Sequence, residues 1–308
     1  LWNAARFMFQ NLGGHPFRPL SESDLAAEDR WILSRLSKVI RNVDEELQAY
    51  NPSAALGAAR EFFWGELCDW YLEIIKPRMR DEDAAPTARS VLALAFDHVL
   101  RLFHPFVPFI TETLWERLNG QCPVRGLAAP LPASPLLLQA PWPVPNAQWE
   151  DGALEADFGL AFDLVRAIRD MRARRGVSPA LKLSVHVRTT ENNAAVLARL
   201  RSFVIHLAHL ESLDAGPAVV RPAAAAVQVA GGMEIFVPGL VDPVRERRQL
   251  TAKRDKLAEE AGKIETKLGN EGFLARAPAE VVEKERRKLA ECRSQIEALE
   301  AGLRELAP

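Results

Sequence analysis

Apolar residues recur every three or four positions over most of the first 121 residues, and this period predicts amphipathic helices. Residues 1–12 follow the pattern until "GGHPFRP" interrupts it. It resumes over residues 21–51, 51–76 and 87–120, and "HPFVPF" divides the last stretch in two. Five amphipathic helices with short breaks predict an antiparallel helical bundle over residues 1–121.

The pattern changes after the bundle. Residues 122–149 are rich in Pro and apolar residues, which predicts an irregular connector. From residue 150 to 241 the sequence predicts a small α/β module with a helix over 157–177, a strand in "KLSVHVRT" and a helix over 193–213. The module closes with a hairpin around Gly231–Gly232.

Residues 242–308 carry heptad spacing in two segments on either side of "GNEGFLARAPA". This spacing predicts an antiparallel coiled-coil hairpin that buries a single seam and projects as an arm. The fold class is therefore mainly α, with a bundle, a small α/β junction module and a C-terminal coiled-coil hairpin. The predicted seam contains Leu250, Arg254, Leu257, Ala261, Ile264 and Leu268 in the first segment, and Val282, Glu285, Leu289, Cys292, Ile296, Leu299, Leu303 and Leu306 in the second.

Composition and charge limit the kinds of partner and site that we expect for this chain. The chain has 308 residues and a net charge of −2, so an anionic partner must meet a local basic patch. Three widely spaced Cys argue against a disulfide framework and a zinc site, and no apolar run is long enough to span a membrane. We expect a cytoplasmic setting and no membrane partner. The opening "LWNAARFMFQNL", which has no initiator Met, resembles a piece of a longer chain.

Most isolated candidates for chemistry have a structural interpretation. Cys68 lies among aromatic residues at helical spacing, and a small buried hydrophobe is favoured over a redox or metal role. His206 and His209 lack a third ligand nearby in sequence, so we expect no metal site. No phosphate loop or nucleophile motif is present, and we predict no catalytic residue in this chain.

Two basic clusters have two interpretations, a phosphate-binding face or a solvated face, and the spacing of their residues does not decide between them. One cluster is "RAIRDMRARR" and the other is "RERRQLTAKRDK". The first contains Arg166, Arg169, Arg172, Arg174 and Arg175, and the second contains Arg245, Arg247, Arg248, Lys253, Arg254 and Lys256.

Four stretches follow one another along the chain: "LWNAARF", "DRWILSRL", "EFFWGELCDWYLEIIKPRM" and "HPFVPFITETLWERL". In this order they resemble the anticodon-binding domain of class I aminoacyl-tRNA synthetases, and more narrowly the valyl-tRNA synthetase family. A fifth stretch, "KLGNEGFLARAPAEVVEKERRKL", resembles that family's C-terminal coiled-coil arm. The ATP-site signatures and the editing domain of the family are absent. The resemblance implies a C-terminal part that is inactive alone, without a cofactor of its own, in a parent enzyme that uses ATP to join valine to its tRNA.

The resemblance also implies sites. In similar enzymes the Phe that closes "LWNAARF" stacks on the middle anticodon base and the Leu of "DWYL" packs against it; these positions are Phe7 and Leu72, with Arg6 beside them. Most other aromatic rings of residues 61–79, Trp64 foremost, are expected in the bundle core. The arm is expected to contact the tRNA elbow through Arg247, Arg248, Arg254 and Lys256.

The implied partners are valine tRNA and the catalytic and editing domains of the same parent chain, and we expect a monomer. The alternative hypothesis is a protein-interaction scaffold that dimerises through the coiled coil at Leu299, Leu303 and Leu306. The two hypotheses differ in salt response, because each phosphate contact releases a counterion whereas a hydrophobic seam does not.

Overall fold

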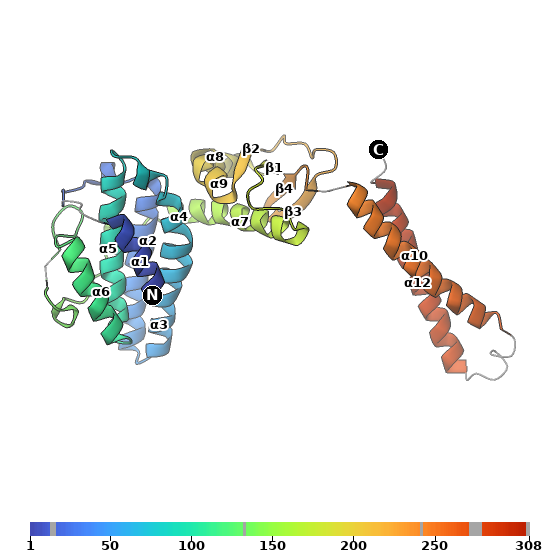
Figure 1. Cartoon of the computed structure of the whole chain (residues 1–308), viewed down its shortest axis with the longest axis horizontal. Coiled ribbons are helices and arrows are strands. Elements are labelled where there is room, and N and C mark those ends of the chain that lie inside the picture. The colour runs from blue at the N-terminus through green and yellow to red at the C-terminus, as the bar shows by residue number, and fades with distance from the viewer. Residues whose placement is uncertain (13–16, 132–133, 241–242, 271–278, 306–308) are drawn as a thin grey trace. The chain divides into compact units, whose positions relative to one another are not determined.

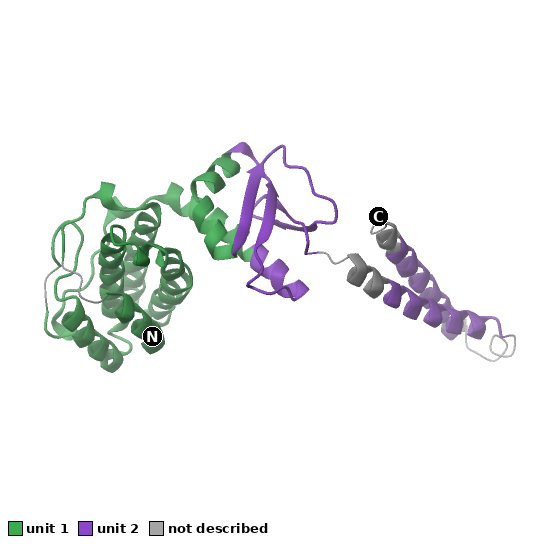
Figure 2. Ribbon diagram, turned by 45° about the horizontal axis from the view of Figure 1, so that its top comes forward, with its two compact units in different colours: residues 1–166, 192–208 green, residues 167–191, 209–308 purple. Residues whose placement is uncertain are grey.

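A computed structural model describes residues 1–12, 17–131, 134–240, 243–270 and 279–305. For residues 243–250, 279–280, 298 and 301–305 it describes the backbone alone. The described chain is mainly helical with one small four-stranded sheet (Figure 1). It divides into two compact units, one formed by residues 1–166 and 192–208 and the other by residues 167–191 and 209–308 (Figure 2).

The first unit is built on helices whose buried faces follow the apolar period of the sequence. Helix α2 buries Trp31, Ile32, Leu36, Ile40 and Val43. It ends where Tyr50 adopts a φ of 57°. The next helix starts with its N-cap Asn51, whose side chain accepts a hydrogen bond from the Ala54 N–H group. The helices are α1 (Trp2–Leu12), α2 (Ala27–Gln48), α3 (Pro52–Glu61), α4 (Leu72–Ile75), α5 (Ala85–Phe103) and α6 (Pro108–Gln121).

The segment predicted as one helix over 51–76 has a π-helical middle. Between α3 and α4, residues Phe62–Tyr71 form the π segment, and the Leu72 N–H group closes on the Leu67 carbonyl five residues back. Such i→i+5 bonding is rare, and it changes which side chains share a face. Four large rings of this stretch are buried as expected, namely Phe62, Phe63, Trp70 and Tyr71. Trp64 is 40% exposed, so its expected place in the core was wrong.

The connector contains two short 3₁₀ turns, Leu137–Gln139 and Ala147–Trp149, and other 3₁₀ turns lie at Glu22–Asp24 and Arg78–Arg80. Helix α7 (Gly152–Arg175) follows and contributes residues to both units. The next helices along the chain are the shorter α8 (Glu191–Arg199) and α9 (Arg201–Ala208).

The sheet of the second unit has the strand order β2-β1-β4-β3. Strand β1 (Leu183–Arg188) pairs in parallel with β2 (Leu210–Gly216) and antiparallel with β4 (Met233–Val237). Strands β3 (Ala226–Ala230) and β4 form the predicted hairpin, and Gly231 and Gly232 between them both have positive φ, as a two-residue turn requires. The helix predicted over 193–213 was wrong in its last part, because residues from Leu210 onward pair with β1 as a strand.

Helices α10 (Pro243–Leu268) and α12 (Ala279–Glu305) pack against each other. Among the side chains described in these two helices, the buried seam contains Ala261, Ile264 and Cys292, with Leu257, Leu268, Leu289 and Ile296 partly buried around it. Ion pairs flank this seam on the exposed sides, from Lys267 to Glu285 at 2.8 Å and from Arg293 to Glu265 at 2.8 Å. The side chains of Leu250, Leu303 and Leu306, which were predicted for the same seam, lie outside the described residues.

Candidate nucleic-acid interface

Phe7 lies on α1 with its ring half-buried. The Nζ atom of Lys76 lies 5.4 Å from the centroid of this ring, within the range of a cation–π contact. Arg6, the neighbouring residue, is exposed. The first predicted position is therefore an aromatic ring at the surface of the first unit with a cation over it.

Leu72 is 5% exposed and begins α4. Lys76 is the residue that directly follows α4. Because Lys76 contacts the Phe7 ring, the end of α4 lies close to α1. Lys76 also pairs with Glu73 at 2.5 Å. The sequence interpretation did not include Lys76 as a site residue, although the cation follows the apolar run "YLEII" directly.

A second pair of aromatic and cationic groups lies on α1 and α6. Trp2 is 46% exposed, and the guanidinium carbon of Arg117 lies 5.9 Å from its ring centroid and 5.6 Å from that of Phe9. Trp64 contributes a further exposed ring, which makes edge contacts with Phe63 and Phe103. The exposure of Trp2 and Trp64 was not predicted.

The basic end of "EIIKPRM" is divided between surface and core. Arg78 donates to Glu28 at 2.6 Å and to both carboxylate oxygens of Asp29, at 3.0 and 2.9 Å. Tyr71 donates its hydroxyl to Asp29 at 2.7 Å. Burial raises the pKa of Glu28, and the neighbouring Asp29 carboxylate adds to this rise. Arg78 is thus a structural ion-pair partner that fastens the end of α4 to the first turn of α2.

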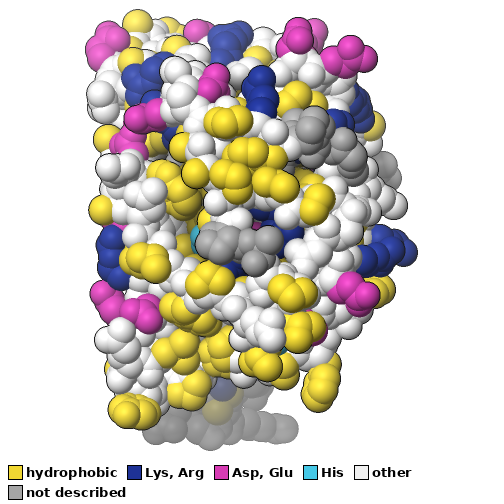
Figure 3. Space-filling model, turned by 90° about the vertical axis from the view of Figure 1, so that its left-hand side faces the viewer, with side chains coloured by type: hydrophobic (Ala, Val, Ile, Leu, Met, Phe, Trp, Pro, Cys, Tyr) yellow, Lys and Arg dark blue, Asp and Glu magenta, His cyan; other side chains and the backbone are white. Residues whose placement is uncertain are grey.

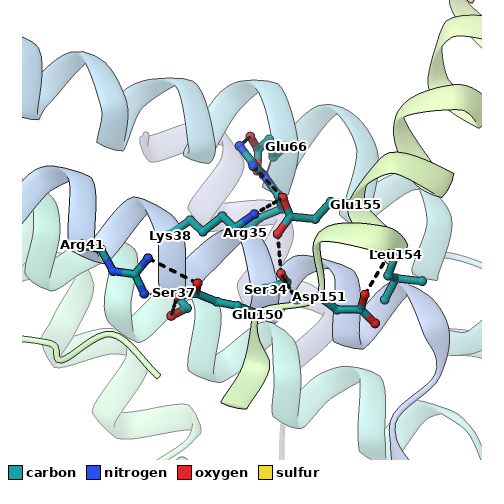
Figure 4. A network of polar contacts seen from close by, with 10 residues as sticks. All are labelled: Ser34, Arg35, Ser37, Lys38, Arg41, Glu66, Glu150, Asp151, Leu154 and Glu155. Carbon is teal, nitrogen blue, oxygen red and sulfur yellow. Dashed lines mark hydrogen bonds and ion pairs between the residues drawn. The ribbon is translucent and has the colours of Figure 1, made fainter. Parts of the chain in front are cut away.

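A polar network fixes the start of α7 on α2 (Figure 4). Arg35 bridges Glu66 at 2.7 Å and Glu155 at 3.1 Å, and Lys38 adds a pair with Glu155 at 2.8 Å. Basic side chains of this α2 face are therefore occupied by carboxylates. The other contacts run from Arg41 and Ser37 to Glu150, from Ser34 to Glu155, from the Asp151 N–H group to Ser34 and from the Leu154 N–H group to Asp151.

Of the first basic cluster, Arg172 is not a surface group. It is 6% exposed and donates to the backbone carbonyls of Leu181 at 2.6 Å and His209 at 2.8 Å. It therefore holds the turn before β1 to the start of β2. Arg174 pairs with Asp170 at 2.8 Å at the exposed end of α7.

The second cluster begins α10. Arg254 is half-buried and donates to the adjacent Asp255 at 2.9 Å, and Lys256 is exposed. Lys256 lines a groove of about 540 Å³ between α10 and α12 together with Lys253 and Leu257. The side chains of Arg247 and Arg248 lie outside the described residues.

The isolated candidates have structural partners. Cys68 is half-buried in the π segment, and burial raises the pKa of its thiol to about 12, so the group is a neutral thiol at pH 7. His206 contacts the Glu73 carbonyl and His209 the Ala180 carbonyl. In the part of the chain that the structure describes, no cluster of three His, Cys, Asp or Glu is arranged for a metal ion, and no helix is apolar and long enough to cross a bilayer.

Comparisons with known proteins bear on these surfaces. Residues 29–187 match the family model for the anticodon-binding domain of tRNA ligase. The chain belongs to this family. Residues 242–307 match a second model, the valyl tRNA synthetase tRNA binding arm.

Relatives in this family extend the match to the whole chain. It is 39% identical over 317 residues to a valine–tRNA ligase of Geobacter sulfurreducens. The aligned region covers 99% of this chain and 34% of that ligase. Corresponding ligases of Rhodopirellula baltica and Syntrophotalea carbinolica are 33% and 34% identical, covering 97% and 100% of this chain and 29% and 34% of their own length. The chain spans about a third of the length of these curated relatives.

The comparisons confirm the resemblance to the valyl-tRNA synthetase family and the interpretation as a tRNA-binding C-terminal region. They do not favour the dimerisation scaffold. The individual site residues stay predictions.

Proposed function

We propose that this chain is the part of a valine–tRNA ligase that holds valine tRNA, with the bundle at the anticodon and the arm at the tRNA elbow. In the full-length enzyme it would support the ATP-dependent attachment of valine, with the catalytic and editing domains in the same chain, as a cytoplasmic monomer. The observation that carries the proposal is the order of the two tRNA-binding family matches along one chain. The valine assignment rests on the names of the relatives.

The proposed architecture has four parts: an antiparallel bundle over 1–121, a connector over 122–149, an α/β module over 150–241 and a coiled-coil arm over 242–308. The arm is supported by the packing of α10 on α12. Pairing of Lys267 with Glu285, and of Glu265 with Arg293 further along α12, fits two helices that run in opposite directions.

The anticodon contact is assigned to Phe7, with Leu72 and Arg6 beside it. Single-stranded loops are recognised through unstacked bases that lie on aromatic faces. The half-buried Phe7 ring, the adjoining end of α4 and the nearby Lys76 supply an aromatic surface with a cation for the phosphate backbone. At the arm, Arg247, Arg248, Arg254 and Lys256 are assigned to backbone phosphates, since an elbow of paired loops is recognised by shape and charge.

The test is a filter-binding titration of the chain with valine tRNA at low salt. Phe7→Ala is expected to raise the Kd by about 5- to 150-fold, because one base–aromatic stack contributes about 1–3 kcal/mol. The matched control is Phe109→Ala, which removes a ring that is 90% exposed at the start of α6 and is outside the proposed contact. Equal Kd values for wild type and Phe7→Ala would refute the stacking assignment.

A second comparison tests whether binding depends on the anticodon of the tRNA. A tRNA with a different anticodon is expected to bind the wild-type chain more weakly, and to bind Phe7→Ala no more weakly than it binds wild type. If valine tRNA and the other tRNA bind the wild type equally, anticodon recognition by this chain is refuted while the arm contact stands.

A further inference from the structure

A cavity of about 890 Å³ lies in the first unit between the bundle and the connector. The tRNA proposal does not use it. Its walls come from α2, α5, the segment before α2 and two stretches of the connector. This volume falls in the usual range for small-molecule pockets.

The inner wall of the cavity is apolar. Leu20, Leu33 and Leu94 line it and are each at most 4% exposed. At the connector side, Trp142 and Val144 line it and are 36% and 76% exposed, so the mouth is also apolar. Figure 3 views the molecule from the side of α6 and the connector, where hydrophobic side chains gather at the surface.

The charged groups in the wall are nearly all satisfied within the protein. Arg101 is held by Asp97 at 2.6 Å and by the Pro141 carbonyl at 2.7 Å. Arg30 pairs with Asp151 at 3.6 Å. Glu150 accepts from Ser37 at 2.9 Å and pairs with Arg41, and Glu22 is exposed to solvent. The cavity therefore offers little uncompensated charge, which favours an uncharged ligand.

His98 contributes a polar side chain to the wall of the cavity. Its side chain is 8% exposed, and it lines the cavity from the same α5 face as Leu94 and Arg101. Its Nδ1 atom lies 2.9 Å from the Leu94 carbonyl, which can only accept, so Nδ1 carries the proton. Burial lowers the pKa of His98 and keeps the ring neutral. Nε2 is then an acceptor that has no hydrogen-bond partner among the described residues.

We propose that this cavity binds an uncharged and mainly apolar small molecule that donates one N–H or O–H hydrogen bond to Nε2 of His98. The apolar walls provide the burial, and the single acceptor selects molecules with a donor on one edge. The residues that line the cavity include none of the proposed tRNA contacts at Phe7 or on the arm. The proposed ligand site is therefore distinct from tRNA binding.

The test compares indole with 1-methylindole in a saturation-transfer NMR titration of the full chain. The two probes share one flat ring system, and methylation removes the donor. Indole is expected to bind about five- to tenfold more tightly, the effect of one hydrogen bond, although the added methyl group favours apolar burial of its analogue. No saturable binding of indole, or tighter binding of 1-methylindole, would overturn the proposal.

Two variants locate the site. His98→Leu removes the acceptor and is expected to bring indole to the affinity of 1-methylindole. Ala129→Trp adds a ring at an exposed position in the wall and is expected to weaken both probes. Binding of both probes to Ala129→Trp as to wild type would place them elsewhere and refute the site, and the wild-type comparison decides the matter if either variant fails to fold.

Discussion

Gly126, in the connector, occupies a backbone conformation that other residues rarely adopt. Its φ is 141°, and a Cβ atom built there would lie 2.1 Å from the carbonyl oxygen of Ala129. Gly126 also forms an isolated bridge with Pro130, so the chain turns back on itself at this point. Arg125, which directly precedes Gly126, donates to the buried carboxylate of Asp97 at 2.8 Å. The turn and the ion pair together fix the connector to α5.

Gly126→Ala is expected to lower the free energy of unfolding of the first unit by about 2–4 kcal/mol, since both the clash and the positive φ oppose it. Gly120→Ala is the matched control, because a Cβ at Gly120 in α6 meets no atom within 4 Å. It is expected to be neutral or to stabilise by about 0.5–1 kcal/mol. Urea unfolding followed by circular dichroism measures both, and equal stability of the two variants would contradict the account.

At the scale of the element, the helix pair α10–α12 has a narrow core. Ala261, Ile264 and Cys292 are its buried members, and the surrounding side chains are polar or partly exposed. Among the side chains that the structure describes in this pair, only these three are buried, so each of them carries a large share of the packing energy of that part.

Ile264→Ala is expected to cost the helix pair about 2–4 kcal/mol, through lost transfer energy and the cavity that remains. Lys263→Ala, one residue away, removes an exposed side chain with an i,i+4 partner in Glu259 and is expected to cost at most about 0.5 kcal/mol. Limited proteolysis within residues 243–305 reports the opening of the pair. Similar cleavage rates for the two variants would refute this role of Ile264.

Sequence periodicity predicted elements whose partners are local. The helices α1, α2, α5 and α6 and the β3–β4 hairpin follow from apolar spacing and turn residues. Strand β2 did not, because Leu207, Leu210 and Leu213 also fit helical spacing. The chain leaves the helix at His209, whose φ is 51°, and Leu213 then pairs with Val185 of β1, a distant partner that spacing cannot reveal.

The π segment explains the error at Trp64. The expected burial assumed 3.6 residues per turn, whereas i→i+5 bonding over Phe62–Tyr71 redistributes the side chains around the axis. For the candidate site, Phe7 and Leu72 came from the family resemblance. Lys76 required the structure, because its contact with Phe7 joins residues far apart in sequence.

At the scale of the whole molecule, the net charge of −2 provides no general attraction for tRNA. Affinity must come from local groups, and several basic side chains of the first unit are already paired with carboxylates. The arm cations Lys253 and Lys256 are exposed, which makes the arm the expected source of salt-dependent binding.

The double variant Arg254→Gln, Lys256→Gln is expected to weaken valine tRNA binding and to reduce the slope of log K against log salt by about one to two. Arg221→Gln, at an exposed position between β2 and β3, is the control and should leave the slope unchanged. Filter binding over a range of salt concentrations measures the slope. An unchanged slope in the double variant, with a dimer seen by light scattering at every salt concentration, would favour the scaffold hypothesis.

The ammonium group over the Phe7 ring has a consequence for any base that arrives there. One face of the ring is already in use, so an incoming base must either take the opposite face or displace Lys76, at a loss of about 0.5–1 kcal/mol for an exposed contact. A displaced ammonium group would be close to the phosphate that precedes or follows that base. Binding of the base would then exchange the cation–π contact of Lys76 with Phe7 for an ion pair between Lys76 and a phosphate. The side chain that covers the ring in the free chain would contact the nucleotide in the complex.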